Sequence, residues 1–462
     1  MVSPNRLVGV VALLLVAAGV ASCGSSDSGA APSAEPNTFC EDGSQARKLG
    51  CQYLVTFYPR WFSHNQLKLV PENFLLGPAM VDPTFEKVVA VNVDTLYATS
   101  QVNVKDEPVV VSVPPTSVVF SVLHLDQFGE TFAGIPSGAP GAYALTSAGW
   151  QGTLPSGVTQ VPLPYDLSIV IFRADRFGVG GTDTQAAAAQ FRSELRLARL
   201  SKYTTDPTAG ATTLVGPGSF ATSFKVMADT AIATDPTQFL ADLQDAVRAS
   251  TTQPLSPRER AIADAFDAQG ASPELVAGAV AGYEALLANY RAHALAGSKW
   301  IYFDNIARCD DTPRGALDRA SITEYLQYGN AREASVYYHT FHDGAGAALD
   351  GSAGRYDLHF AAHQLPEVGR FWSLTAYTPD TVELVPNSAN KYAVASYTPA
   401  LVTGADGSIT ITMADALPAG VPEANWLPVP RGPFNVVLRA YEPKGAALDG
   451  RYVPPGVARA LQ

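Results

Sequence analysis

The sequence has 462 residues, of which 47% are hydrophobic and 16% are charged, and its 31 basic and 43 acidic residues give a formal net charge of −12. This acidic balance, with scattered lysines and arginines, excludes nucleic-acid binding and charge-driven binding to anionic lipid as main functions. An aromatic content of 10% excludes a disordered chain, and the length suits two domains or one large one.

The N-terminus has the pattern of a bacterial lipoprotein signal. Arg6 precedes an apolar run at residues 7–20, and small residues then lead to Cys23. Because a bilayer-spanning helix needs roughly 20 apolar residues, this run is typical of a cleaved signal. We expect a signal peptide at residues 1–22 and a diacylglyceryl anchor on Cys23, which places the protein on the extracytoplasmic face of the cell membrane. An ordinary secretory signal is the alternative.

Residues 23–39 are small and polar and predict a flexible tether after the anchor. Cys40, Cys51 and Cys309 then remain in an oxidising compartment. A Cys40–Cys51 disulfide would close a short loop and stabilise the fold by about 3 kcal/mol. The spacing leaves the other two pairings open.

The body of the chain predicts three regions. Residues 40–178 begin with an aromatic-rich helix, interrupted near Pro59, and continue as short β-branched runs that predict an N-terminal β domain. Residues 179–325 are mainly helical in pattern, with a helix expected over 184–203 and a capping box that opens another at Ser256. Strand patterns return over residues 326–462. We therefore expect a mainly β fold of two antiparallel β-sandwiches, jelly-roll-like, joined by a helical segment.

Two stretches resemble the paired bacterial families DUF1254 and DUF1214. NVDTLY at residues 92–97 is similar to the N-x-D-T-L-Y motif of DUF1254, and GWQG at residues 149–152 follows it. FWSLTAY at residues 371–377 and LRAY at residues 438–441 are similar to the core and closing signatures of DUF1214. The resemblance implies two domains in this order. It implies no activity, because the families are defined by sequence alone.

Common catalytic motifs are missing from the sequence. It contains no G-x-S-x-G elbow, no H-E-x-x-H, no Walker loop and no strand-flanked G-x-G-x-x-G. A convergent active site remains open, with Asp94, His124 and Asp126 as candidate catalytic residues. His124 and Asp126 share one face of a strand and are candidates for a general base and its orienting partner. Glycoside hydrolysis with retention would require Asp94 and Asp126 about 5 Å apart. A turn at Asp94 and a satisfied core pair are the alternatives.

A second set of residues could bind a small polar ligand. Asn92 shares a strand face with Asp94, aromatic side chains can stack on sugars, and an arginine can hold an acidic group. The candidate ligand-binding residues are Asn92, Tyr97, Tyr143, Trp372, Tyr377 and Arg439. Core packing is the alternative for the aromatic residues and for Arg439.

Histidines are concentrated at residues 339–363. His339, His342 and Asp343 form a candidate metal site, because imidazole and carboxylate groups are good transition-metal ligands. A divalent metal is the less favoured interpretation, since the spacing suits helices and the surrounding pattern is β. No other cofactor is indicated.

The expected function is that of an envelope-anchored lipoprotein that binds a small polar or amphipathic envelope molecule, namely a saccharide or a glycolipid. A secreted hydrolase acting on an ester or glycosidic bond is the alternative, and a scaffold without a ligand is the third. The expected partner is therefore a small molecule or glycan. We expect no nucleic acid, and a membrane contact through the lipid anchor alone. The sequence does not decide whether the protein is an enzyme.

Overall fold

The computed structural model describes residues 39–69, 71–78, 80–83, 89–216, 223–249, 253–270 and 272–460. The predicted signal peptide, Cys23 and the predicted tether up to residue 38 lie outside these residues. Asn37–Gln462 forms one compact unit. In the described part of the chain, no helix combines the length and the apolar character that crossing a membrane requires.

The described strands up to residue 216 form two five-stranded sheets around one apolar core. The first has the order β10 (Leu214–Gly216), β1 (Leu76–Pro78), β2 (Thr95–Asn103), β7 (Leu167–Asp175), β4 (Phe120–Leu125). The second has the order β6 (Val158–Pro162), β5 (Gly141–Thr146), β3 (Val109–Val113), β8 (Arg196–Arg199), β9 (Ala211–Thr212). Short helices η1 (Val179–Gly181), α2 (Gln185–Glu194) and α3 (Leu200–Thr205) accompany these sheets.

The long strands β2 and β7 fix the register of the first sheet. They run antiparallel from Thr95 opposite Asp175 to Asn103 opposite Leu167. Every residue of β7 is buried, which is expected of a central strand covered on both faces. The two sheets share one apolar core, because Phe172 of β7 belongs to the same core cluster as residues of β3 and β5.

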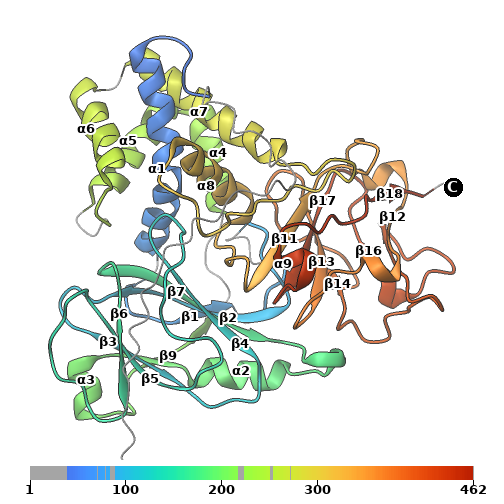
Figure 1. Ribbon diagram of the computed structural model, residues 1–462, viewed down its shortest axis with the longest axis horizontal. Coiled ribbons are helices and arrows are strands. Elements are labelled where there is room, and N and C mark those ends of the chain that lie inside the picture. Colours follow the sequence, from blue (N-terminus) through green and yellow to red (C-terminus); the bar gives the residue numbers. More distant parts are fainter. Residues whose placement is uncertain are drawn as a thin grey trace, which may run out of the picture. The chain divides into compact units, whose positions relative to one another are not determined.

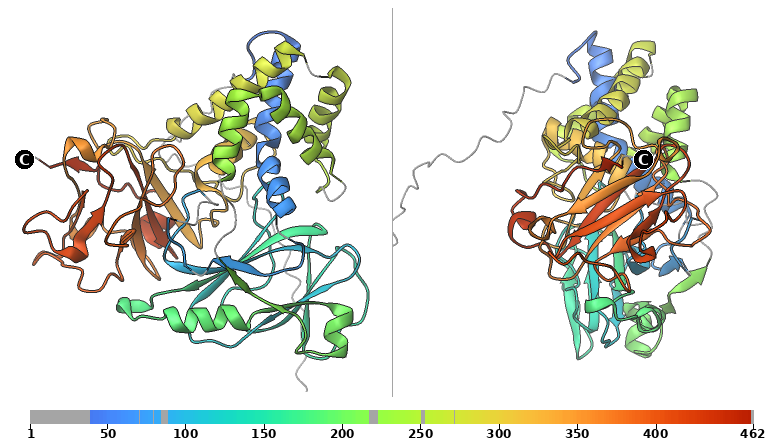
Figure 2. Two further views of the ribbon diagram at one scale, coloured as in Figure 1. Left: turned by 180° about the vertical axis from the view of Figure 1, so that it is seen from behind. Right: turned by 90° about the vertical axis from the view of Figure 1, so that its right-hand side faces the viewer.

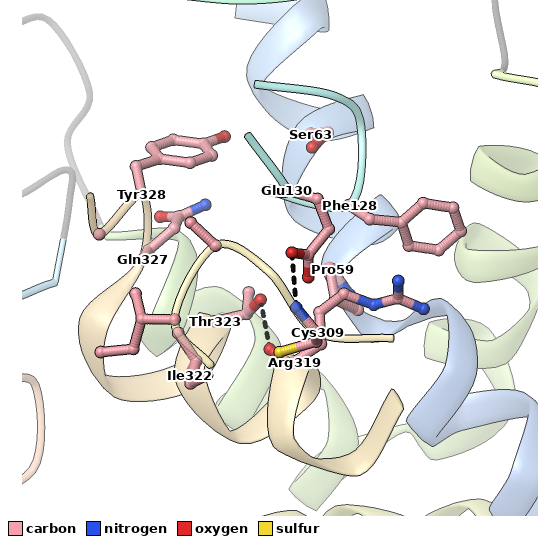
Figure 3. Close-up of a pocket in the computed structure, with 14 residues that line it drawn as sticks. Pro59, Ser63, Phe128, Glu130, Cys309, Arg319, Ile322, Thr323, Gln327 and Tyr328 are labelled. Carbon is pink, nitrogen blue, oxygen red and sulfur yellow. Dashed lines mark hydrogen bonds between the residues drawn. The ribbon is translucent and has the colours of Figure 1, made fainter. Parts of the chain in front are cut away.

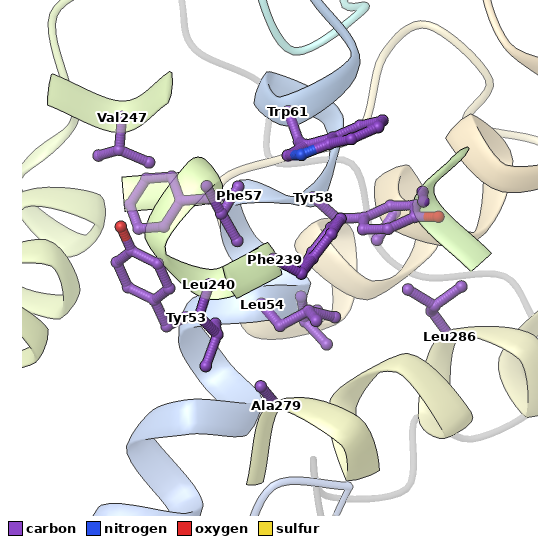
Figure 4. Close-up of a cluster of buried hydrophobic side chains, with 14 of the residues drawn as sticks. Tyr53, Leu54, Phe57, Tyr58, Trp61, Phe239, Leu240, Val247, Ala279 and Leu286 are labelled. Atoms are coloured by element: carbon purple, nitrogen blue, oxygen red, sulfur yellow. The ribbon is translucent and has the colours of Figure 1, made fainter. Parts of the chain in front are cut away.

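A group of helices packs around α1 (Gln45–Leu69), as Figures 1 and 2 show. The others are α4 (Phe224–Thr234), α5 (Pro236–Arg248), α6 (Pro257–Gln269), α7 (Pro273–Ala292) and α8 (Pro313–Leu326). Figure 4 shows the core of this group, in which Tyr58 and Trp61 of α1 lie against Phe239 of α5. The predicted capping box at Ser256 is confirmed, since its side chain accepts from the backbone of Glu259.

Helix α1 continues through Pro59, so the predicted interruption is wrong. A proline inside a helix costs about 3 kcal/mol because it removes a backbone hydrogen bond and crowds the preceding turn. Tyr58 and Arg60, its two neighbours, are almost fully buried in the helical core. Packing of this segment outweighs the local preference.

The remaining described strands form two four-stranded sheets. The first has the order β11 (Ser335–Thr340), β17 (Asn435–Tyr441), β13 (Trp372–Tyr377), β14 (Ala393–Ala395). The second has the order β16 (Trp426–Pro428), β15 (Ile409–Ala414), β12 (Tyr356–Phe360), β18 (Ala458–Arg459). Leu374 and Leu438 of the first sheet share a core with Leu358 and Ile411 of the second. Short helices η2 (Gly351–Ala353), η3 (Ala362–Gln364), η4 (Glu423–Asn425) and α9 (Gly445–Leu448) lie in the connections.

The fold is mixed α/β rather than mainly β. Of the described residues, 31% are in helices and 25% are in strands. The predicted helical middle segment is present. The pairings of the described strands show no jelly roll, and β1–β10, β5–β6 and β15–β16 are parallel pairs in otherwise antiparallel sheets.

The predicted boundary at residue 178 divides the N-terminal sheets. Strands β8, β9 and β10 lie within the expected helical region 179–325, yet they complete both of those sheets. Arg196–Arg199 was expected inside a helix, but it pairs with β3 from Arg199 opposite Val109. Alanine and leucine favour helices locally, and the pairing with β3 outweighs that preference.

Candidate functional site

The NVDTLY segment forms a turn that leads into β2. Asn92 Oδ1 accepts hydrogen bonds from the backbone nitrogens of Asp94, at 3.0 Å, and Thr95, at 3.2 Å. Its side chain therefore organises the backbone, and it has little exposure to any ligand because it is 8% exposed. The segment is a turn, as the alternative for Asp94 predicted, although Asn92 supplies the accepting oxygen.

Asp94 is fully buried and accepts three hydroxyl hydrogen bonds from side chains in the C-terminal part of the chain. Ser373 Oγ donates at 2.8 Å, Tyr441 Oη at 2.9 Å and Tyr397 Oη at 2.5 Å. Burial and the nearby Asp94 carboxylate raise the pKa values of both tyrosines well above their usual range, so each keeps its donor proton. Asp94 holds two parts of the chain together and does not face solvent.

Two further candidate ligand-binding residues have the same role. Tyr377 Oη donates to the carbonyl oxygen of Val91 at 2.7 Å, and Arg439 donates to the carbonyl oxygen of Ala90. The guanidinium carbon of Arg439 lies 5.6 Å from the centre of the Tyr377 ring. Both side chains are at most 2% exposed and hold the backbone that precedes Asp94.

His124 and Asp126 lie far from Asp94. The backbone oxygen of Asp94 accepts a hydrogen bond from the backbone nitrogen of Arg176, just after β7. His124 of β4, in contrast, lies opposite Val170 of β7. These positions are six residues apart along a strand, or about 20 Å. The predicted catalytic set Asp94, His124 and Asp126 therefore does not form one site, and the carboxyl separation required for retaining glycoside hydrolysis is absent.

His124 and Asp126 each organise local backbone. His124 Nε2 accepts from the backbone nitrogen of Ile135 at 2.9 Å, and desolvation lowers the pKa of its imidazole to about 4. Asp126 Oδ1 accepts from the backbone nitrogens of Phe128 and Glu130 at 2.8 and 2.9 Å. Asp126 shapes the loop that follows β4.

The candidate metal ligands do not converge. His339 is buried, its Nδ1 lies 2.7 Å from Tyr290 Oη, and its Nε2 lies 2.8 Å from Asn435 Oδ1. Asp343 Oδ1 accepts from backbone nitrogens of its own turn. Within the described ranges, no group of three or more His, Cys, Asp or Glu side chains is arranged to hold a metal ion. The predicted metal site at His339, His342 and Asp343 is therefore not formed by the described residues.

The remaining aromatic candidates belong to separate cores. Tyr143 packs in the core of the N-terminal sheets and donates to the carbonyl oxygen of Ala139 at 3.2 Å. Trp372 packs in the core of the C-terminal sheets. Tyr97 lies beside Arg173, whose guanidinium carbon is 5.6 Å from the centre of the ring. These three side chains do not form a stacking surface for a sugar.

A small pocket lies beside Glu130 (Figure 3). It is formed by α1, by the loop that contains Phe128 and Glu130, by the segment around Cys309 and by α8, and its volume is about 20 Å³. Glu130 accepts from the backbone nitrogen of Cys309 at 2.8 Å. Arg60 and Arg319 both stack on Phe128, at 4.4 and 4.2 Å from the ring centre.

A larger cleft lies beside the Cys40–Cys51 disulfide, which the structure contains. Its volume is about 390 Å³, and its walls come from α1, α6 and the start of α8. Ala261 and Ala265 are exposed on α6, one turn apart, and border it. The lining residues are mostly apolar: Phe39, Cys40, Glu41, Leu49, Gln52, Val55, Thr56, Arg258, Ala261, Ile262, Ala265, Pro313 and Ala316.

Comparison with protein families identifies two regions. Residues 71–199 match DUF1254 and residues 334–445 match DUF1214, both described as proteins of unknown function. The chain contains a DUF1254 domain followed by a DUF1214 domain. The turn at Asn92 lies in the first domain. Five side chains that bond to this turn and to the backbone before it lie in the second domain: Ser373, Tyr377, Tyr397, Arg439 and Tyr441. The buried network around Asp94 therefore joins the DUF1254 domain to the DUF1214 domain.

Two solved structures are similar to the chain. The crystal structure of the VPA0106 protein from Vibrio parahaemolyticus is 21% identical, with a TM-score of 0.58 over 90% of this chain and 100% of that one. An uncharacterised protein from Burkholderia cenocepacia is 13% identical, with a TM-score of 0.42 over 91% of this chain and 94% of that one. No curated protein matches the chain. The first of these likenesses shows the fold alone.

The residues that line the two pockets could not be predicted from the sequence. Glu130 and Arg319 belong to no motif, and 189 positions separate them in the chain. The one available signal for the cleft was the pair Cys40 and Cys51, which fixes the start of α1. Small exposed residues on α6 carry no pattern of their own.

Proposed function

We propose that this protein is an envelope-anchored lipoprotein that binds a small amphipathic molecule, the alkyl part of which occupies the cleft beside the Cys40–Cys51 disulfide. The observation that carries this proposal is the cleft itself, with a volume of about 390 Å³ and a mainly apolar lining. Sites for small molecules are typically concave, apolar and about 300–1,000 Å³ in volume, with a few polar groups.

The apolar walls favour an alkyl chain. Leu49 and Val55 of α1 line the cleft opposite Ala261, Ile262 and Ala265 of α6. Each methylene group that leaves water for such a wall contributes about 0.8 kcal/mol. A free saccharide lacks this contribution, and the aromatic residues expected to stack on sugars lie in the domain cores. These contacts support a lipid over a free sugar.

The polar lining favours a head group that carries hydroxyls. Arg258 donates to Asp311 Oδ1 at 2.9 Å, and Glu41 lies 3.4 Å from Lys48 Nζ, so both charges already have partners. Gln52 also lines the cleft and offers an amide. Because the charges are compensated, hydrogen bonds to sugar or glycerol hydroxyls suit this lining better than a bare phosphate does. A glycolipid combines both parts.

The predicted anchor supports a lipid ligand. Cys23 precedes Phe39, a lining residue of the cleft, by 16 residues. Even a fully extended chain of this length reaches at most about 55 Å. Lipidation of Cys23 would therefore keep the cleft near the membrane surface, where amphipathic molecules are concentrated.

The geometry gives no support to a hydrolase built from Asp94, His124 and Asp126, because Asp94 lies about 20 Å from the other two along the sheet. Two pockets with polar groups also argue against a scaffold that binds nothing.

A chain-length series tests the proposal. Octyl, nonyl and decyl glucosides, used below their micelle concentrations and measured by calorimetry, should bind about fourfold more tightly with each added methylene group. Glucose alone should not bind. Ala265→Trp fills the cleft and should abolish binding, whereas Ala268→Trp, on an exposed position of the same helix outside the cleft, should not. Equal binding by the two variants, or no dependence on chain length, would overturn the proposal.

A further inference from the structure

The cleft beside the Cys40–Cys51 disulfide is lined by one amide side chain that has no partner in the described part of the protein. Gln52 of α1 lines the cleft, and within the described residues its amide group makes no hydrogen bond. The side chain is partly exposed, and its amide oxygen and nitrogen are accessible rather than buried. Gln52 can therefore bond to a molecule in the cleft without breaking a bond of the fold.

The position of Gln52 on α1 directs it to the cleft. Leu49 and Val55, three residues before and after it, also line the cleft, and residues three apart share one face of a helix. Another face of α1, with Leu54 and Tyr58, is buried in the helical core. Gln52 thus places an amide in the middle of an apolar wall.

The other polar side chains of the cleft are committed to the protein. Arg258 Nη2 lies 2.8 Å from Asp311 Oδ1, and Arg258 Nη1 donates to Thr56 Oγ1 at 3.4 Å. Thr56 is also 2% exposed, and Glu41 forms an ion pair at 3.4 Å with a lysine of α1. The unpartnered amide is therefore the lining group best able to recognise a ligand through hydrogen bonds.

The turn of α1 that carries Gln52 is held on two sides. The disulfide joins Cys51, the preceding residue, to Cys40 in the wall of the cleft. Helix α7 packs closely against the same turn, because a Cβ atom at Gly282 would lie 2.9 Å from the carbonyl oxygen of Cys51. A backbone that is already ordered lowers the entropy lost when the side chain binds a ligand.

We propose that Gln52 selects amphipathic molecules that carry two adjacent hydroxyl groups, as alkyl glycosides and glycerol ethers do. This inference rests on the proposed function and names the chemistry that the cleft recognises. A carboxamide presents an acceptor oxygen and N–H donors side by side, and a hydroxyl group can donate or accept. One hydroxyl therefore donates to Gln52 Oε1 while its neighbour accepts from Nε2. Two hydroxyls that are not adjacent satisfy half of the amide.

Two isomers of octylglycerol test this selection. 1-O-octylglycerol carries adjacent hydroxyl groups, whereas 2-O-octylglycerol has the same atoms and alkyl chain with its hydroxyl groups separated. Calorimetry on the full chain, below the micelle concentrations, should show about fivefold tighter binding of the first isomer, the equivalent of one neutral hydrogen bond. Octyl glucoside, which also has adjacent hydroxyls, distinguishes the two sources of the ligand. Tighter binding than that of 1-O-octylglycerol indicates a sugar, and weaker binding indicates a glycerol lipid.

Gln52→Met keeps the length of the side chain but removes its amide. This variant should bind both isomers with equal affinity, because the apolar walls remain. Gln269→Met, at an exposed position of α6 outside the cleft, is the matched control and should keep the preference of the wild type.

The outcomes separate the role of Gln52 from the proposed function. Equal binding of the two isomers by the wild type would overturn the role of Gln52, even if Gln52→Met did not fold, and would leave the alkyl cleft in place. A preference that persists in Gln52→Met would come from the shape of the isomers and would also overturn the inference. If neither isomer binds, the inference and the proposed function are both wrong.

Discussion

Ser373 of the DUF1214 domain donates a hydrogen bond to Asp94 of the DUF1254 domain over 2.8 Å, although 279 positions separate the two residues in the sequence. Tyr441 donates to the same carboxylate oxygen at 2.9 Å. The conspicuous sequence motifs of the two domains thus meet in one buried network. Their joint presence in the chain has a structural reason, since each motif supplies the hydrogen-bond partners of the other.

Asp94→Asn should destabilise the protein by about 2–4 kcal/mol. The amide keeps one acceptor oxygen but places an NH₂ group against hydroxyls that can no longer donate to a carboxylate. Urea unfolding followed by circular dichroism measures the effect. The exposed Asp106→Asn variant is the control and should change the free energy of unfolding by less than about 0.5 kcal/mol.

Tyr441→Phe, made alone and combined with Asp94→Asn, tests whether the loss of stability comes from this network. Because both residues share one hydrogen bond, the double variant should lose less stability than the two single losses added together. Strict additivity would contradict the assignment of Asp94 as the centre of the network.

His339 should make the fold sensitive to acid. Asn435 Nδ2 donates to the carbonyl oxygen of Thr378, so Asn435 Oδ1 accepts from His339 Nε2, and His339 Nδ1 accepts from Tyr290. Desolvation lowers the pKa of His339 to about 3, from 6.5. The imidazole of the unfolded chain takes up a proton near pH 6.5, whereas the buried one stays neutral down to about pH 3. The folded state therefore loses stability as the pH falls from 6.5 towards 3, at up to about 1.4 kcal/mol per pH unit.

Unfolding curves between pH 7 and pH 4.5 measure this loss. The free energy of unfolding of the wild type should fall more steeply than that of His339→Gln, which does not titrate. His359→Gln, at an exposed position, is the matched control and should behave as the wild type does. Equal slopes for the wild type and His339→Gln would show that the imidazole is not held neutral.

Gly278 permits the close approach of α7 to α1. A Cβ atom at this position would lie 1.9 Å from the carbonyl oxygen of Arg47. Gly278→Ala should therefore cost about 2 kcal/mol or more, despite the better helix propensity of alanine. Urea unfolding of both variants measures the difference, and Gly432→Ala, where a Cβ atom meets open space, should leave the free energy of unfolding unchanged. A neutral Gly278→Ala would mean that the two helices are not in contact at this point.

Cys23 is the predicted site of lipidation. Cys23→Ser should abolish labelling by radioactive palmitate in a bacterial host and should move the protein out of the membrane fraction. Cys309→Ser, which changes a buried cysteine that stays unpaired, should leave labelling unchanged. Continued labelling of Cys23→Ser would contradict the anchor and favour an ordinary secretory signal.

Local patterns identified much of the secondary structure. The capping box at Ser256 begins a helix, and β7 lies among the β-branched runs of residues 40–178. The errors arose where tertiary contacts outweigh local preference. Pro59 stays within α1 because its neighbours are buried, and Arg196–Arg199 forms a strand because it completes a sheet.

The site was harder to predict, because its partners are distant in the sequence. The pattern singled out Asp94 as a candidate catalytic residue and Tyr377 and Arg439 as candidate ligand-binding residues, but it could not show that these side chains bond to distant segments of the chain. The cleft and the small pocket depend on how α1 packs against α6 and α8. No periodicity within one segment contains that information.

Native mass spectrometry of the full chain, released from bacterial membranes in a mild detergent, tests the central claim most directly. The protein should carry an organic mass that dissociates on activation and whose fragments show both an alkyl chain and a hydroxylated head group. Ala265→Trp should lack this mass, and Ala268→Trp should retain it. A wild-type chain with no bound mass, or a mass retained equally by Ala265→Trp, would contradict the assignment of the cleft as the binding site for an amphipathic molecule.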